Sequence, residues 1–402
     1  MTNSNDIVIV SAVRTPFSPF GGVLREMHST DLGALVIKEV LERVDLSGDV
    51  VDELYYGMCI QSEAALESNV NGRQALLKAG MPADLISLTI DRACCSSLTA
   101  VQLGIRTIIA GDAEVLMAVG AENMSNTPLV MNGHRWGTKL QQPVFKDHLN
   151  PIFYTNHNAL AKDAGEVALE HGIDREAQDR WALGSQEKYQ EAKKLGKFKD
   201  ELMPVIIPQR KGDPIVFEED AFPKPHTTME GLAKLKTVYA SPTVTAGNAP
   251  GLDAGASAVL FMRRSKAEEL GLEPLATILT VKSVAMEPRY MAEAPGYAIL
   301  KALKKSDMTM SDIDLVEINE AFAAMPLVST KILAENDMEK WEEIKKITNV
   351  NGDAIALGHP VGASGARILM TLMYELRRRG GGLGAAGICG GLAQADAAII
   401  RV

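Results

Sequence analysis

Cys94, in the segment TIDRACCSSLTA, follows a strand-like run and lies at the start of a predicted amphipathic helix. A helix N-terminus offers unpaired N–H groups and about half a positive charge. Both favour a thiolate over a thiol, and the thiolate is the nucleophilic form of cysteine. The pattern therefore predicts a nucleophile at position 94. A small cysteine that only packs in the core is the alternative interpretation of the same residue.

His359, in ALGHPVGASGAR, is the histidine whose surroundings best suit proton transfer. Pro360 restricts His359 to extended conformations, and the neighbouring glycines permit a tight loop at the start of a helix. A histidine held in this way suits the role of general base. The other six histidines lie in polar or insertion-like stretches, so we expect no comparable role for them.

Two further segments add candidate groups at the ends of predicted strands. Cys389, in GAAGICGGLAQADA, precedes Gly390 and Gly391, and glycines let backbone N–H groups approach a reacting oxygen closely. Asn319, in DLVEINEAFAAM, carries an amide that could hold a water or polarise a carbonyl group. The alternatives are a core cysteine at a strand end and an ordinary helix cap.

Several other patterns predict no chemistry. The remaining two cysteines, Cys59 and Cys95, are expected to pack in the core. Four cysteines without regular spacing predict no disulfide framework, and the lack of a C-x-x-C or H-x-x-x-H pairing predicts no metal site. Residues 382–387, GLGAAG, match the dinucleotide fingerprint. They follow a predicted helix and lead into a strand, which is the reverse of the context that this motif requires.

The composition excludes several classes of protein. The chain has 402 residues, of which 46% are hydrophobic and 23% charged, so it can bury a large core in two or three domains. The net charge of −10 argues against a general nucleic-acid binder. No apolar run approaches the roughly 20 residues of a membrane span, and the start of the chain lacks the layout of a signal peptide. We therefore expect a soluble, cytoplasmic α/β protein.

The elements that would position these groups form two similar units. The run IVIVSAV at 7–13 predicts a buried strand. Later, CSSLTAVQLGIRTIIAG predicts a helix that leads into the strand AEVLMAVGAE, and GASGARILMTLMYELRRRG predicts a helix that leads into the strand GLGAAGI. A duplicated α/β half follows from this likeness. Residues of about 125–252 contain a charged helix and a proline-rich segment, which predict an inserted lobe that carries substrate-binding groups.

Taken together, these segments resemble the thiolase family over almost the whole chain. The motifs SAVRTPF, the segment around Cys94, NEAFA at 319–323, GHPVGASGAR at 358–367 and the terminal C-x-G occur in the family's order and at its spacing. In the middle lobe, GKFKDELMPV, the AKLK run and TVTAGNAPGLDAGASAVL resemble the family's loop-domain landmarks.

The resemblance implies a fold, a substrate and an assembly. The fold is a duplicated five-layer α/β/α/β/α arrangement, with helices between two mixed sheets and an inserted loop domain that holds coenzyme A. The expected boundaries are 1–124 with 253–273 for the first half, 125–252 for the loop domain and 274–402 for the second half. The family implies acyl-CoA as substrate, no permanently bound cofactor, and a homodimer or homotetramer.

The resemblance also implies a role for each candidate residue in making or breaking the carbon–carbon bond of a 3-oxoacyl-CoA. Cys94 looks like the nucleophile that His359 activates. Cys389 looks like the acid/base that protonates the leaving acetyl-CoA enolate, or removes its α-proton in the synthetic direction. Asn319 would hold a water that forms one oxyanion hole together with His359. The backbone N–H groups of Cys94 and Gly391 would form the other.

The chain departs from the family's usual pattern on the substrate side. The positions expected to contact coenzyme A or the acyl group are Leu160, Lys224, Tyr239, Ala246, Pro250 and Met291. Because several of these differ from the usual residues, we expect an acyl group that is bulkier than acetyl, branched or carboxylated. One concrete example is an aromatic or dicarboxylic substrate such as benzoylsuccinyl-CoA, whose thiolase subunit works with a small OB-fold partner.

Two alternative functions remain open at this point. A ketoacyl-synthase-like condensing enzyme would use one cysteine with a His/His or His/Asn pair, so the two cysteines at 94 and 389 favour a thiolase. The second alternative is a non-catalytic acyl-CoA-binding protein that kept the fold. The altered positions on the substrate side keep this alternative open.

Overall fold

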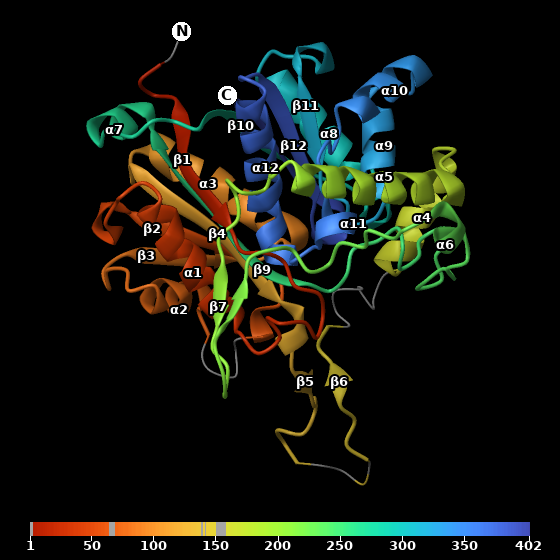
Figure 1. Ribbon diagram of the computed structural model, residues 1–402, viewed down its shortest axis with the longest axis horizontal. Coiled ribbons are helices and arrows are strands. Elements are labelled where there is room, and N and C mark those ends of the chain that lie inside the picture. Colours follow the sequence, from red (N-terminus) through yellow and green to blue (C-terminus); the bar gives the residue numbers. More distant parts are fainter. Residues whose placement is uncertain (1–2, 64–68, 138–139, 141, 150–157) are drawn as a thin grey trace.

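The computed structural model describes residues 3–63, 69–137, 140, 142–149 and 158–402. Within them, strands from both ends of the chain form one nine-stranded mixed sheet with the order β11-β12-β13-β10-β1-β9-β4-β2-β3 (Figure 1). Antiparallel pairs join most neighbours, while β2 pairs in parallel with β3 and β4, and β11 pairs in parallel with β12. The sheet therefore has two portions that meet at β1 and β10.

The N-terminal portion contains the strand predicted at 7–13. Its strands, in sheet order, are β1 (Ile7–Arg14), β9 (Ala254–Arg263), β4 (Val115–Asn123), β2 (Glu53–Gly57) and β3 (Ile86–Ile90). All residues of β1 and β4 are buried, as expected for strands with both faces covered. Because β9 lies between β1 and β4, the chain returns to this portion after its long middle stretch.

The C-terminal portion repeats the plan with four strands. These are β10 (Ala276–Ala285), β13 (Gln394–Arg401), β12 (Leu383–Cys389) and β11 (Leu315–Ile318). Only residues 7–9 of β1 pair with residues 276–278 of β10, so a short ladder joins two sheets into one. The expectation of two separate sheets is corrected to this extent.

Helices cover the two portions in layers. Three helix pairs form these layers: α1 (Ser29–Glu42) with α2 (Asn71–Lys78), α3 (Ser96–Ala110) with α12 (Ser364–Arg378), and α8 (Ala294–Lys305) with α9 (Ala324–Leu333). The first pair shares a buried cluster with strands of the N-terminal portion, and the third pair shares one with strands of the C-terminal portion. The second pair lies in the middle and shares a buried cluster with strands of both portions. The predicted α/β/α/β/α layering is confirmed.

The stretch between β4 and β9 forms the inserted lobe. It contains the hairpin β5 (Leu129–Val130) and β6 (Lys146–Asp147), the hairpin β7 (Val205–Ile207) and β8 (Ile215–Phe217), and the helices α4 (Leu160–Glu170), α5 (Arg175–Lys194) and α6 (Met229–Ala233). The β5–β6 hairpin projects from the body of the molecule (Figure 1). The exact domain boundaries given above stay a prediction.

Short elements complete the description. The helices are α7 (Arg264–Glu269), α10 (Met338–Lys346) and α11 (Ala354–Leu357), and the 3-10 turns are η1 (Gly48–Val50), η2 (Gln61–Glu63), η3 (Ala93–Cys95), η4 (Met124–Asn126), η6 (Pro288–Tyr290), η7 (Met310–Asp312), η8 (Val361–Ala363) and η9 (Gly391–Ala393). The turns η3 and η8 precede α3 and α12, so both middle helices start from a tight turn.

The stretch Ala93–Ala110, which is η3 with α3, is long and apolar enough to cross a membrane by length and composition alone. This corrects the expectation that no run approaches that length. The stretch packs between the two sheet portions and is 56% buried, as the core helix of a layered protein is. Localisation stays a prediction.

A buried ion-pair cluster fixes the inserted lobe to β1. The Arg14 side chain, in the SAVRTPF motif, is fully buried. Its Nε donates to Glu201 Oε1 at 2.7 Å, and its two terminal nitrogens donate to the Asp220 carboxylate at 2.7 and 2.9 Å. Because a buried charge is costly unless it is paired, this bidentate contact determines where the lobe lies.

Candidate active site

Cys94 lies in the η3 turn between β3 and α3, where its side chain is half-buried. The preceding residue, Ala93, has φ +54°, a left-handed conformation that is uncommon for a residue other than glycine. Two local contacts hold this turn. Ala93 N–H donates to Asp91 Oδ1 at 2.9 Å, and Ser96 Oγ donates to the Ala93 carbonyl at 2.6 Å. The turn directs the Cys94 sulfur away from the core and into a cavity.

His359 lies in the loop between α11 and η8, and its ring faces Cys94. The distance from His359 Nε2 to Cys94 Sγ is 3.1 Å. On the other side of the ring, Nδ1 lies 2.6 Å from Ser364 Oγ, and this hydroxyl donates its proton to the Pro360 carbonyl at 2.8 Å. Nδ1 must therefore donate to Ser364, which leaves the Nε2 lone pair directed at the thiol. This is the tautomer that a general base needs.

The electrostatics of the pair differ from the sequence expectation. A hydrogen bond between Cys94 and Cys389, together with burial, raises the pKa of the Cys94 thiol well above its usual range. Burial, with the nearby Arg367 cation, lowers the pKa of His359 to about 4. The resting pair is therefore a neutral thiol beside a neutral imidazole.

The predicted thiolate at a helix start is thus wrong for the unliganded site. Cys94 precedes the N-cap of α3, which is Cys95, and its sulfur faces another thiol instead of a cation. The proton can pass to His359 only when the sulfur attacks an electrophile. The arrangement is suited to nucleophilic acyl transfer with general-base assistance.

Asn319 joins the same group at the end of β11. Its Oδ1 accepts from Arg367 Nη2 at 3.1 Å, which fixes the amide orientation and turns Nδ2 toward His359 Nε2 at 3.5 Å. Arg367 is itself fully buried between Asp353 at 2.5 Å and Glu317 at 3.3 Å. The Asn319 amide and the imidazole thereby converge on one region, where they could stabilise an oxygen that gains charge.

A cavity of about 290 Å³ contains the two reactive sulfurs and His359. Five of the six predicted substrate-side residues line it: Leu160, Tyr239, Ala246, Pro250 and Met291. The sixth, Lys224, does not. Its side chain is exposed, and its ammonium lies 4.7 Å from the ring of Phe222. Cys59, predicted to pack in the core, packs against a buried apolar cluster and also forms part of the cavity wall.

Gly391 differs from its predicted role. Its N–H donates to the Arg92 carbonyl at 3.2 Å, and Gly391 does not line the cavity. The two following residues, Leu392 and Ala393, have φ +53° and +56°. This tight turn rotates the Gly391 N–H toward η3, so as the structure stands it is not free to contact a reacting oxygen.

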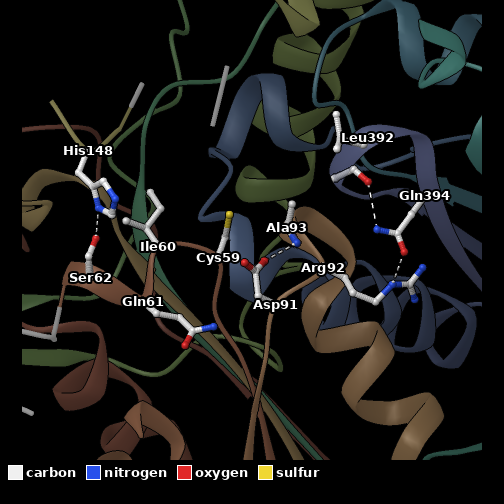
Figure 2. Close-up of a pocket in the computed structure, with 11 residues that line it drawn as sticks. Cys59, Ile60, Gln61, Ser62, Asp91, Arg92, Ala93, His148, Leu392 and Gln394 are labelled. Carbon is white, nitrogen blue, oxygen red and sulfur yellow. Dashed lines mark hydrogen bonds between the residues drawn. The ribbon is translucent and has the colours of Figure 1, made fainter. Parts of the chain in front are cut away.

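A second hollow, of about 440 Å³, lies on the other side of Cys59 and Ala93, which line both spaces. Figure 2 shows that its walls combine polar side chains, such as Gln61 and Asp91, with apolar ones, such as Ile60 and Leu392. Several of its side chains bond to each other: Ser62 with His148, Arg92 with Gln394, and Asp91 with the Ala93 backbone. The hollow thus adjoins the cavity at two shared residues, whereas Cys94 itself lines only the cavity.

Three residues that orient the site were not found by reading the sequence. Ser364 lies five positions after His359 in GHPVGASGAR, and this spacing was the one available signal. Arg367 and Asp253 reach the site through long-range contacts, since Asp253 Oδ2 accepts the His359 N–H at 2.6 Å from a position 106 residues away. A sequence pattern does not show that a charged residue is buried.

Comparisons with known proteins agree with this geometry. The family model described as "Thiolase, N-terminal domain" matches residues 7–265, and "Thiolase, C-terminal domain" matches residues 272–402. The chain is 44% identical over 390 residues to an acetyl-CoA acetyltransferase of Cupriavidus necator, with 96% of each chain covered. It is 39% identical over 406 residues to an acetyl-CoA acetyltransferase of Syntrophomonas wolfei, with 99% of each covered.

Solved structures show the same likeness. Human mitochondrial 3-ketoacyl-CoA thiolase in complex with CoA superimposes with a TM-score of 0.91 and 36% identity, over 99% of this chain and 98% of that one. The acetyl-CoA acetyltransferase of Bacillus anthracis superimposes with a TM-score of 0.92 and 36% identity, again over 99% and 98%.

Proposed function

The chain belongs to the thiolase family of acyltransferases, and from this premise we propose that it cleaves or forms the carbon–carbon bond of a 3-oxoacyl-CoA through an acyl group on Cys94. The observation that carries the proposal is the 3.1 Å contact of Cys94 Sγ with His359 Nε2, inside a cavity that also contains Cys389. Coenzyme A enters this reaction as a substrate, as in the human relative solved with CoA.

In the cleavage direction, the first step forms the acyl-enzyme. His359 Nε2 takes the proton of Cys94 as the sulfur attacks the 3-oxo carbon, whose oxygen becomes an oxyanion. The carbonyl re-forms, the bond between C2 and C3 breaks, and its electron pair leaves on the enolate of acetyl-CoA, while the shortened acyl chain stays on Cys94. Cys389 supplies the proton that converts this enolate into product. The Asn319 amide, oriented by Arg367, lies where it can stabilise a developing negative charge.

The second step returns the enzyme to its starting state. The Cys389 thiolate accepts the proton of a free coenzyme A thiol, whose sulfur then attacks the acyl group on Cys94. The Cys94 sulfur leaves and regains its proton from His359. Two cysteines are required because one sulfur is occupied by the acyl group while the other moves the proton. Run backward, the same steps make a Claisen condensation.

The acyl group is proposed to be larger than acetyl. The second hollow supports this, because it adjoins the cavity at the shared residues Cys59 and Ala93. The altered residues Leu160 and Pro250 line the cavity that the substrate must enter. The curated relatives are named acetyl-CoA acetyltransferases, so the size of the acyl group is the point to test.

A rate comparison tests both parts of the proposal. Thiolysis is measured with acetoacetyl-CoA, a longer linear 3-oxoacyl-CoA, and an aromatic 3-oxoacyl-CoA, each with free coenzyme A. We expect kcat/KM to be highest with one of the larger acyl groups. Fastest turnover of acetoacetyl-CoA would refute the larger acyl group, and no thiolysis of any member would refute the activity. The homodimer or homotetramer and the small OB-fold partner remain predictions, which the mass of the purified protein in solution checks.

A further inference from the structure

The nucleophile and the base come from opposite portions of the molecule. Cys94 follows β3 of the N-terminal portion, whereas His359 belongs to the C-terminal sequence. His359 lies in residues 358–366, here called the loop, which include η8 and the first residues of α12. Only the short β1–β10 ladder pairs the two portions of the sheet. The 3.1 Å distance between sulfur and imidazole therefore depends on how this loop is held against the N-terminal portion.

Four buried side chains of the N-terminal portion reach the backbone of the loop. Each forms one hydrogen bond with it: Asp253 Oδ2 accepts from His359 N at 2.6 Å, Glu122 Oε2 accepts from Gly362 N at 3.0 Å, Ser257 Oγ donates to Ala363 O at 2.6 Å, and Ser97 Oγ accepts from Ala366 N at 2.9 Å. They come from α3, β4, β9 and the residue just before β9. The loop is thus fixed at intervals along its length by residues far away in sequence.

The backbone of the loop lies directly on the ends of these strands. A Cβ added at Gly120 would lie 2.2 Å from the Gly362 carbonyl oxygen, and one added at Gly362 would lie 2.6 Å from the Gly57 carbonyl oxygen. No side chain separates the two backbones at these points. A change in one of the four hydrogen bonds therefore changes the position of the loop itself.

We infer that Ser97, Glu122, Asp253 and Ser257 form an interdomain clamp whose role is to hold the His359 imidazole at bonding distance from Cys94. None of the four lines the cavity, so they act through the backbone and are positioning residues. The inference rests on the proposed function, because it assumes that His359 takes the Cys94 proton. A displacement of about 1 Å in such a pair can cost on the order of a hundredfold in rate.

Both carboxyl groups of the clamp are buried, and among the described residues neither forms a hydrogen bond with a cation. Glu122 accepts backbone N–H groups from Cys59, Ile60 and Gly362, and the acidic Glu63 disfavours its charge. Asp253 accepts the His359 N–H, and the charges of Lys224 and Asp220 act on it in opposite directions. Burying an unpaired carboxyl group costs free energy, and this cost is understandable where an oxygen acceptor is needed to hold a functional loop.

The test uses Ser257→Ala, with Ser11→Ala as its matched control. Ser11 is also a buried strand serine, on β1 beside β9, but its hydroxyl has no partner among the described residues. Two readouts are measured well below the unfolding transition: kcat for thiolysis and the rate of Cys94 alkylation by iodoacetamide at pH 7, read by peptide mass. Ser257→Ala is expected to lower both about tenfold, because one hydrogen bond is lost, while Ser11→Ala leaves both unchanged.

A second pair of variants, at Asp253, keeps the test decisive if one of the serine variants fails to fold. Asp253→Asn keeps an oxygen acceptor for the His359 N–H and is expected to retain activity within a few-fold, whereas Asp253→Ala is expected to lose about a hundredfold. Equal losses in Ser257→Ala and Ser11→Ala, or unchanged kcat in Asp253→Ala, would overturn the clamp.

His359→Asn separates this outcome from failure of the proposed function. If His359→Asn slows Cys94 alkylation but the clamp variants do not, the clamp proposal is wrong and the proposed Cys94–His359 pair is supported. If His359→Asn leaves the alkylation rate unchanged, the proposed pair itself is wrong.

Discussion

The turn that carries Cys94 and the loop that carries His359 are held in different ways. In the turn, residues 91–96, local contacts of Asp91 and Ser96 hold the left-handed backbone at Ala93, while the Arg92 side chain anchors the turn to Gln394 and Asp396. In the loop, residues 358–366, the backbone itself bonds to side chains more than a hundred residues away. The comparison teaches that local contacts shape the backbone that directs the sulfur, whereas the packing of the two portions determines whether a base meets it.

The largest expected effect tests whether turn and loop act as one unit. Cys94→Ala should lower kcat for thiolysis by about 10⁴-fold or more, and His359→Asn by about a thousandfold. The double variant should be no slower than Cys94→Ala, because the base has no function without its sulfur. If the fold-loss in kcat of the double variant equals the product of the two single losses, the turn and the loop act independently, which would contradict this account.

The next effect concerns the oxyanion site on the loop side. Asn319→Ala should lower kcat by about 10²- to 10³-fold with little change in the affinity for coenzyme A, because it removes one oriented donor. Stopped-flow or steady-state thiolysis gives kcat, and calorimetric titration gives the affinity. A change confined to affinity would place Asn319 in substrate binding instead.

A pH-dependent effect on stability sharpens the description of the loop. Burial raises the pKa of Asp253 from 3.8 to about 7. A carboxyl with a raised folded-state pKa contributes stability that is fully present below its unfolded pKa and is lost as the pH rises through the folded value. Relative to Asp253→Asn, the wild-type protein should therefore lose free energy of unfolding between pH 5 and pH 8.

Urea unfolding of both proteins at the two pH values measures this difference. Other titrating groups, such as His359, are present in both proteins and cancel in the comparison. Identical pH dependence in wild type and Asp253→Asn would contradict the assignment of a buried, uncompensated carboxyl.

The smallest effect is expected away from both segments, at Lys224. Its exposed ammonium lies outside the cavity, and a screened surface charge contributes about 0–1 kcal/mol. Lys224→Ala should raise the KM for coenzyme A a few-fold at most and leave kcat unchanged. Lys211→Ala, at another exposed position, is the control. A drop in kcat at Lys224 would show that the lobe does more than bind substrate.

Much of the fold could be predicted from the sequence because its signals are local. The buried run at 7–13 became β1, and the apolar stripes before Gly111 and Arg379 became α3 and α12. The joining of the sheets by three residue pairs could not be predicted, since register between distant strands leaves no local pattern.

In the site, too, features set by local sequence could be predicted, and features set by distant neighbours could not. Cys94, His359, Cys389 and Asn319 were singled out from their segments, and the structure brings them together. The protonation of Cys94 and the contact made by Gly391 were predicted wrongly. Each depends on a neighbour supplied by another part of the chain: a second thiol for Cys94 and the Arg92 carbonyl for Gly391.

The most direct test of the account is the mass of the protein after brief mixing with a 3-oxoacyl-CoA in the absence of free coenzyme A. The account predicts an increase equal to one acyl group, mapped by peptide analysis to Cys94 and removed when coenzyme A is added. An unmodified protein that has nevertheless released acetyl-CoA, or an acyl group on Cys389 instead, would contradict it.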